Sequence, residues 1–260
     1  MALIQCDFFS EILDLHTTMH VILPQPNKSK MDELIDNGKR YPTLFLLHGL
    51  SDDGTNWLRK TSIERYVQDL GIAVVIPKVD RSFYTDMLYG NRYWTFLTEE
   101  LPRVARSFFP LSTKREENFV VGLSMGGYGA FKWALHYPDS FSAAASLSGA
   151  LDIVKWKEDI DQDEKHPLRR TMHLIFGNED IKGSYHDLIG LLEAHHSHTV
   201  KPKLFQCCGS EDFLFDYNMN FMKKCQETNF SLTTDFGPGD HNWSYWDEKI
   251  QDVLKWLPIG

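Results

Sequence analysis

Short apolar runs and amphipathic segments alternate along most of the chain. Continuous apolar runs that end at a turn residue are typical of strands buried on both faces of a parallel sheet, whereas apolar residues at helical spacing indicate helices. We expect strands at residues 6–13, 17–23, 43–47, 72–76, 118–123, 143–147, 203–206 and 231–236. We expect helices at residues 62–70, 93–109, 125–137, 185–196, 214–228 and 243–257. The polar, proline-containing residues 24–41 predict an exposed connection.

This alternation predicts an α/β fold with an eight-stranded, mostly parallel, twisted sheet that carries helices on both faces. The 260 residues suit a single domain covering residues 1–260. Residues 151–201 are more than one crossover helix needs, so we expect a helical excursion there, above the site. Ligands of such sheets bind beyond the carboxyl ends of the strands. The turn residues at those ends are therefore the first place to look for chemistry.

Composition narrows the class of partner. The formal net charge of −9 disfavours nucleic acid and anionic membrane surfaces. No apolar stretch approaches the roughly 18 residues of a spanning helix, and the N-terminus lacks the pattern of a secretory signal. The four cysteines show no zinc-type spacing and predict reduced thiols in a cytoplasmic protein. We expect a small-molecule substrate, no nucleic-acid or membrane partner and no cofactor, and the sequence leaves a homo-oligomer open.

A nucleophile motif follows the predicted strand at residues 118–123. Residues 122–126 read Gly-Leu-Ser-Met-Gly and match G-x-S-x-G, with a helix-forming run after them. In this motif the serine occupies a sharp, strained strand-to-helix turn, where the residues two before and two after it approach so closely that only glycine fits. The helix N-terminus also favours developing negative charge. The motif predicts Ser124 as a nucleophile.

A serine hydroxyl needs a base, and the base needs an acid to orient it. In folds of this kind the chain order is serine, acid, histidine. His241 follows the last predicted strand in a turn-rich loop and is the candidate base. The acid should end the preceding strand, where Asp212 is preferred because it would open the next helix. Glu211 is the second candidate and Asp216 the third.

A tetrahedral intermediate needs N–H donors aimed at its oxygen. The residue after the nucleophile, Met125, supplies one, and the loop after the strand at residues 43–47 supplies the other. Leu50 is the preferred donor in that loop and Gly49 the second choice. His48 is interpreted as a structural, hydrogen-bonding residue rather than a catalytic one.

One cluster of three histidines suggests a metal site. His195, His196 and His198 lie close together in sequence, but no acidic residue accompanies them at a fixed spacing. We interpret the cluster as a polar helix end and predict no metal.

Several segments together resemble the esterase D group of α/β-hydrolases. This group includes tributyrin esterases, S-formylglutathione hydrolases, feruloyl and acetylxylan esterases and mycolyltransferase-like proteins. The similar segments are residues 47–51 (LHGLS), 122–130 (GLSMGGYGA), 143–150 (AAASLSGA), 208–214 (CGSEDFL) and 239–243 (GDHNW). The resemblance implies an α/β-hydrolase fold and a triad of Ser124, Asp212 and His241. It also implies oxyanion N–H groups on Leu50 and Met125.

The tributyrin esterase branch is the most similar, which implies a carboxylesterase acting on short-chain acyl esters. The loop at residues 51–57 lacks the cysteine usual in S-formylglutathione hydrolases, which weakens that narrower assignment. The open alternatives are a carbohydrate-ester esterase, an S-formylglutathione hydrolase, an acyltransferase and an inactive binding protein on the same scaffold. Substrate contacts are predicted at Gly49 and, within two clusters of aromatic residues, at Tyr93, Trp94 and Trp243. The clusters are Phe83, Tyr84, Tyr89, Tyr93 and Trp94, and Phe213, Phe215, Trp243, Tyr245 and Trp246.

Overall fold

The structure, a computed structural model, describes residues 1–25, 38 and 40–259. Its centre is one eight-stranded sheet with the order β1-β2-β4-β3-β5-β6-β7-β8. The first two pairings, β1 with β2 and β2 with β4, are antiparallel, and all the others are parallel. The strands are β1 (Ala2–Ser10), β2 (Leu15–Leu23), β3 (Thr43–Leu47), β4 (Ala73–Pro77), β5 (Asn118–Leu123), β6 (Ala143–Leu147), β7 (Lys203–Gly209) and β8 (Leu232–Gly237). The predicted mostly parallel sheet is confirmed.

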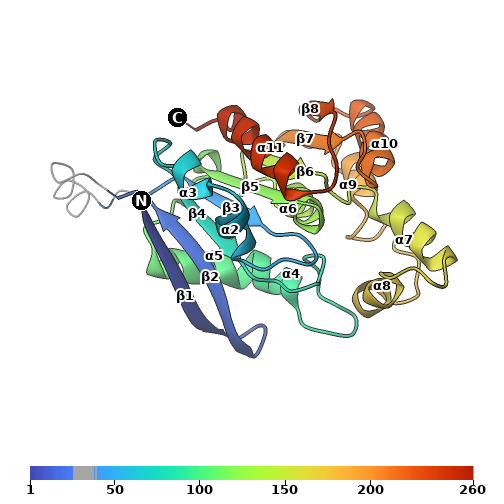
Figure 1. Cartoon of the computed structure of the whole chain (residues 1–260), viewed down its shortest axis with the longest axis horizontal. Coiled ribbons are helices and arrows are strands. Elements are labelled where there is room, and N and C mark those ends of the chain that lie inside the picture. The colour runs from blue at the N-terminus through green and yellow to red at the C-terminus, as the bar shows by residue number, and fades with distance from the viewer. Residues whose placement is uncertain (26–37, 39, 260) are drawn as a thin grey trace.

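Helices cover both faces of the sheet (Figure 1). Because side chains alternate along a strand, Phe45 and Leu47 of β3 face one layer while Leu44 and Leu46 face the other. The first layer includes α4 (Tyr93–Thr95), a π-helical turn (Phe96–Glu100), α5 (Leu101–Phe108), α6 (Met125–His136) and α10 (Phe215–Gln226). The second includes α2 (Asn56–Lys60), α3 (Ile63–Tyr66) and α11 (Trp243–Trp256). A short 3₁₀ turn (Arg115–Glu117) precedes β5.

Most predicted elements are present, with shifted ends. The first strand is earlier than expected because a tight hairpin turn occupies residues 11–14, with Asp14 at a φ of 53°. The helix predicted at residues 62–70 is wrong in length, since only Ile63–Tyr66 is helical and the chain turns before Gly71, whose φ is +66°. The helix predicted at residues 93–109 contains a π-helical turn just before Pro102, which has no N–H to donate. The connection predicted at residues 24–41 lies mostly outside the described residues.

Residues 151–201 contain three helices between β6 and β7. They are α7 (Ile153–Gln162), α8 (Arg169–Phe176) and α9 (Leu188–Ala194). In Figure 1, α7 and α8 lie on the opposite side of the view from the β1–β2 hairpin. Within the described residues, no helix is long and apolar enough to cross a membrane. The treatment of the whole chain as one domain stays a prediction.

Candidate active site

Ser124 occupies a tight turn between β5 and α6. Its φ of 53° and ψ of −119° lie in a strained region for a residue with a side chain. A Cβ on Gly122 would lie 2.2 Å from the Gly126 carbonyl oxygen, and a Cβ on Gly126 would lie 2.5 Å from that of Leu47. The Ser124 N–H donates to the Leu147 carbonyl at 2.8 Å, which ties the turn to the neighbouring strand. Glycine is therefore required at both positions for the serine hydroxyl to stand out from the sheet.

Three side chains that are distant in sequence form a continuous hydrogen-bonded chain. The Ser124 Oγ lies 2.9 Å from the His241 Nε2, and the His241 Nδ1 lies 2.8 Å from the Asp212 Oδ2. A carboxylate only accepts hydrogen bonds, so the Nδ1 of a neutral His241 carries the proton and its Nε2 is free to accept from the hydroxyl. The residues follow β5, β7 and β8, whose carboxyl ends meet at one edge of the sheet. The arrangement can move a proton away from the serine hydroxyl.

The Asp212 carboxylate is buried but well supplied with donors. Burial raises its pKa, but hydrogen bonds from His241, from the Leu214 N–H and from the Ser148 hydroxyl outweigh burial and hold the pKa below its ordinary value. Ser148 is itself strained, with a φ of 50°, and its Oγ accepts from the Trp246 indole N–H at 3.1 Å. The sequence reasoning missed Ser148. Its one available signal was its position immediately after a predicted strand.

The alternative acids lie elsewhere. The Glu211 carboxylate accepts from the Gly239 N–H at 2.6 Å, and Asp216 lies in the first turn of α10, beside a separate groove. Asp212 is the acid that the structure brings to His241.

In the cluster of His195, His196 and His198, the ring centroids of His195 and His198 lie 4.4 Å apart and the rings stack. Among the described residues, no group of three histidine, cysteine or acidic side chains could hold a metal ion.

The two predicted oxyanion donors come from two separate segments of the chain. Met125 is the first residue of α6, so its N–H has no acceptor within the helix. Leu50 follows β3 and lines the same cavity as Ser124. His48 is fully buried beneath this loop, as expected of a structural residue. The arrangement is suited to binding negative charge next to the serine hydroxyl.

A cavity of about 510 Å³ opens above Ser124 and His241. The predicted contacts Gly49 and Trp243 line it. Its other walls are mostly apolar or aromatic and include Leu50, Phe83, Leu123, Trp156, Leu168, Phe213 and Trp246, with Ser51, Asp52, Arg81 and Asn242 as polar members. Trp156 and Leu168 come from the α7–α8 region and were not predicted, because nothing in their local pattern separates them from ordinary core residues.

Tyr93 and Trp94, which were predicted as substrate contacts, do not line this cavity. Tyr93 is buried, and its hydroxyl hydrogen bonds to Asp80. Trp94 packs against His136 and Tyr185. The helix that begins at Tyr93 turns both rings toward protein neighbours outside the cavity, so that Phe83 of the same aromatic cluster lines it instead.

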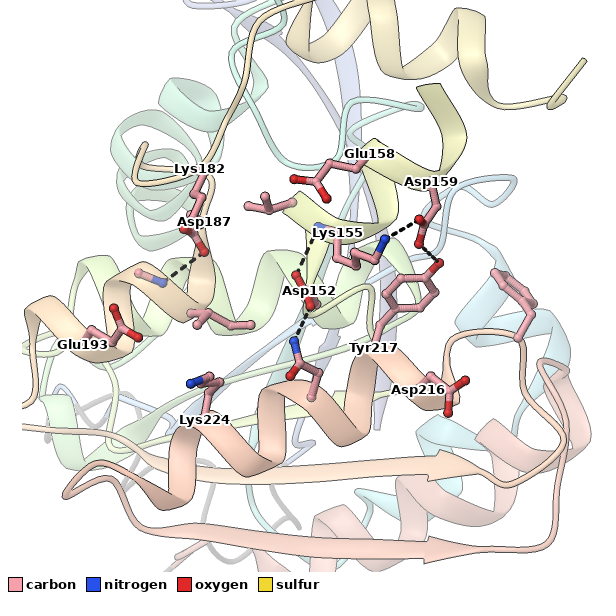
Figure 2. Close-up of a pocket in the computed structure, with 15 residues that line it drawn as sticks. Asp152, Lys155, Glu158, Asp159, Lys182, Asp187, Glu193, Asp216, Tyr217 and Lys224 are labelled. Carbon is pink, nitrogen blue, oxygen red and sulfur yellow. Dashed lines mark hydrogen bonds and ion pairs between the residues drawn. The ribbon is translucent and has the colours of Figure 1, made fainter. Parts of the chain in front are cut away.

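A larger groove of about 890 Å³ lies next to this cavity (Figure 2). Residues of α7, α9 and α10 form its walls, and Phe213 borders both hollows. Six carboxylates line the groove against three lysines: Asp152, Glu158, Asp159, Asp187, Glu193 and Asp216 against Lys155, Lys182 and Lys224. Some charges are paired within the groove, as in the Lys155–Asp159 ion pair at 2.6 Å. The surface beside the cavity therefore carries an excess of negative charge.

Comparisons with known proteins agree with this fold. A family model described as putative esterase matches residues 10–257. An acetyl esterase of Caldicellulosiruptor saccharolyticus is 30% identical over 262 residues, covering 99% of this chain and 98% of the relative. The structure of FphF, a fluorophosphonate-binding serine hydrolase of Staphylococcus aureus, is similar with a TM-score of 0.88 and 36% identity. The structure of an S-formylglutathione hydrolase (FrmB) of the same organism is similar with a TM-score of 0.85 and 36% identity. Each of these two alignments covers 99% of this chain and 98% of the other.

The fold and these matches define an α/β-hydrolase of the serine hydrolase class. More narrowly, the chain belongs to the putative esterase family, and it is an esterase enzyme.

Proposed function

We propose that the protein is a carboxylesterase that hydrolyses short-chain acyl esters through an acyl-enzyme on Ser124. The observation that carries the proposal is the unbroken hydrogen-bonded chain from the Ser124 Oγ through the His241 ring to the Asp212 carboxylate. Such a chain is the geometric requirement for activating a serine hydroxyl.

In the first half of the reaction, the Ser124 Oγ attacks the acyl carbon while its proton passes to the His241 Nε2. Asp212 stabilises the resulting imidazolium and keeps the ring oriented. The N–H groups of Leu50 and Met125 bind the oxyanion of the tetrahedral intermediate. When the intermediate collapses, the C–O bond to the alcohol breaks and the alcohol leaves with the proton held by His241.

In the second half, water attacks the acyl-enzyme and gives a proton to the His241 Nε2. Collapse of the second tetrahedral intermediate releases the carboxylic acid and returns a proton to the Ser124 Oγ. Each proton taken by His241 is given back within the same half-reaction, so the cycle needs no cofactor.

The size and lining of the cavity support a short acyl group. A volume of about 510 Å³ is at the small end of ligand pockets, and aromatic side chains such as Phe83 and Trp156 border it. The relative named acetyl esterase, which aligns along nearly its whole length, supports the same substrate class.

The decisive experiment is Ser124→Ala assayed with p-nitrophenyl acetate and butyrate. If the three residues act as a unit, kcat should fall by about 10⁶-fold. Ser107→Ala, an exposed change on α5, is the matched control and should retain full activity. Activity of Ser124→Ala near that of the control would overturn the proposal.

Hydrolysis of S-formylglutathione is the second candidate, favoured by the 36% identity to the S. aureus enzyme of that name. The acidic groove beside the cavity would repel an anionic thioester, which is why the ester is preferred here. A direct comparison of kcat/KM for S-formylglutathione and p-nitrophenyl acetate separates the two. Product analysis with added alcohols separates hydrolysis from acyl transfer.

A further inference from the structure

We infer that Lys132 is a positioning residue for acyl selectivity, because it holds the strained turn that places the Phe83 ring in the wall of the catalytic cavity. Phe83 lines that cavity, and its ring packs against Trp156, another lining residue, with centroids 5.8 Å apart. Lys132 belongs to α6 and acts on the cavity through Phe83. The inference rests on the proposed function and deepens it, since it concerns the acyl length that the proposed esterase accepts.

Two consecutive aromatic residues after β4 adopt backbone conformations that bulky side chains disfavour. The φ values of Phe83 and Tyr84 are 51° and 50°, in the left-handed region. Such a conformation is unfavourable for a residue with a large side chain, and it persists only where the surrounding structure holds it. The position of the Phe83 ring in the cavity wall therefore depends on the contacts that hold this turn.

Lys132 is connected to the carbonyl groups of both strained residues. Its Nζ donates to the Tyr84 carbonyl at 3.3 Å and to the Thr85 Oγ1 at 2.7 Å. The Thr85 hydroxyl donates in turn to the Phe83 carbonyl at 3.2 Å. One amino group thus reaches Tyr84 directly and Phe83 through a single hydroxyl. Because a hydrogen bond restricts the orientation of the peptide group that accepts it, these contacts oppose relaxation of either φ angle.

The surroundings of Lys132 keep its amino group in place. The side chain is fully buried, and burial lowers its pKa well below the ordinary value. The Nζ lies 4.4 Å from the centre of the Trp94 ring, 4.5 Å from that of the Tyr185 ring and 3.5 Å from the His186 Nδ1. A buried amino group that loses its acceptors cannot replace them with solvent, so breaking the contacts with the turn is unfavourable.

Two further contacts hold the turn against α6. The Phe83 N–H lies 3.3 Å from the Met125 Sδ, and a Cβ on Gly129 would lie 2.5 Å from the Tyr84 Cδ2. Since α6 begins directly after Ser124, the ring in the cavity wall is positioned by the helix that follows the serine. Among these α6 residues, Lys132 is the one connected to both strained carbonyl groups.

Lys132→Met tests the inference, because it keeps a long apolar side chain and removes the donors. Without those donors the turn can relax and the Phe83 ring can move, so longer acyl groups should fit better. The ratio of kcat/KM for p-nitrophenyl octanoate to kcat/KM for p-nitrophenyl acetate should rise by about three- to tenfold, no more than one methylene produces in a hydrophobic pocket. The change should lie mainly in a lower KM for the octanoate, since a cavity wall contacts substrate and transition state alike.

A double-mutant cycle separates positioning from general destabilisation. Phe83→Ala alone should raise the same ratio at least as much as Lys132→Met does. Adding Lys132→Met to Phe83→Ala should raise the ratio no further, because Lys132 acts through the ring that has already been removed. A purely structural role of Lys132 would lower the yield of folded enzyme without changing this ratio.

The hydroxyl that relays the contact provides a second variant and its rescue. Thr85→Val keeps the shape of the side chain but removes the hydroxyl, so it should shift the ratio as Lys132→Met does. Thr85→Ser restores the hydroxyl and should restore the wild-type ratio. Lys249→Met is the matched control, because this lysine on α11 pairs with Asp235 at 2.8 Å and does not contact the turn. Its ratio should equal that of the wild type.

An unchanged or lower ratio in Lys132→Met would overturn the inference. So would a rise that is as large in the Phe83→Ala background as in the wild type. If Lys132→Met does not fold, the comparison of Thr85→Val with Thr85→Ser provides the test, and equal ratios for these two would overturn the inference. Failure of the proposed function is distinct, because Ser124→Ala would then hydrolyse both esters as fast as the wild type.

Discussion

The edge of the sheet that carries Ser124 and the helical segment at residues 151–201 contribute to the same cavity in different ways. At the sheet edge, backbone hydrogen bonds and glycine contacts hold each group, and Ser124 and Ser148 both adopt positive φ values. The helical segment contributes side chains such as Trp156 from surface helices, and a wide groove lies along α7 (Figure 2).

This difference indicates that the sheet edge determines the chemical step and the helical segment determines the choice of substrate. Rigid strand ends can hold reacting atoms to within a fraction of an ångström, which bond making requires. A helical segment attached above them can change its side chains without disturbing those atoms. We therefore expect changes at the sheet edge to alter kcat strongly and changes in the helical segment to alter the choice of substrate.

After Ser124→Ala, the largest effect should come from Asp212→Asn. An amide in place of the carboxylate can hold the His241 ring in the wrong tautomer, and in serine proteases the equivalent change lowers kcat by about 10⁴. Steady-state kinetics with p-nitrophenyl acetate measures the loss. Glu211→Gln is the matched neighbour and should change kcat by no more than a few-fold, because Glu211 contacts Gly239 rather than His241. Equal losses for the two variants would contradict the assignment of the acid.

A smaller effect is expected from Trp156→Ala in α7. Removing the indole enlarges the cavity. The ratio of kcat/KM for octanoyl esters to kcat/KM for acetyl esters should therefore rise by about tenfold, the low end of the discrimination that one methylene produces in a hydrophobic pocket. Trp94→Phe should leave this ratio unchanged, because Trp94 packs against His136 outside the cavity. A series of p-nitrophenyl esters of increasing length provides the measurement. An unchanged ratio in Trp156→Ala would remove α7 from the specificity argument.

The smallest effect concerns acid stability within the helical segment. Burial, followed by the nearby charges of Lys132 and His136, lowers the pKa of His186 to about 2. The unfolded chain binds a proton at this position below about pH 6.5 and the folded chain does not, so folding stability falls as the pH drops below that value. Each pH unit should cost up to about 1.4 kcal/mol from this residue.

Urea unfolding between pH 6 and pH 4 tests this expectation. The slope of unfolding free energy against pH should become shallower in His186→Asn and stay unchanged in His198→Asn, since His198 is exposed. Hydrogen exchange should show the backbone near His186 losing protection before the strands on acidification. An unchanged slope in His186→Asn would show that this histidine is not the group that titrates.

The sequence by itself determined the sheet and the tight turn that carries Ser124. Apolar runs such as Val120–Val121 and the glycines around Ser124 act locally, because strand burial and a turn that admits no Cβ depend on residues adjacent in the chain. The order of serine, acid and histidine also follows from the order of the strands, and it led to His241. Local pattern alone left Glu211 open beside Asp212.

Only the tertiary structure decided which of these neighbouring acids reaches the imidazole and which aromatic rings face the cavity. Tyr93, Trp94 and Phe83 share one segment, yet only Phe83 lines the cavity. The support that Ser148 gives to Asp212 also depends on a contact between two separate strand ends. The physical reason is that the direction of a side chain depends on packing against residues distant in sequence, whereas the conformation of a turn depends on the residues of the turn itself.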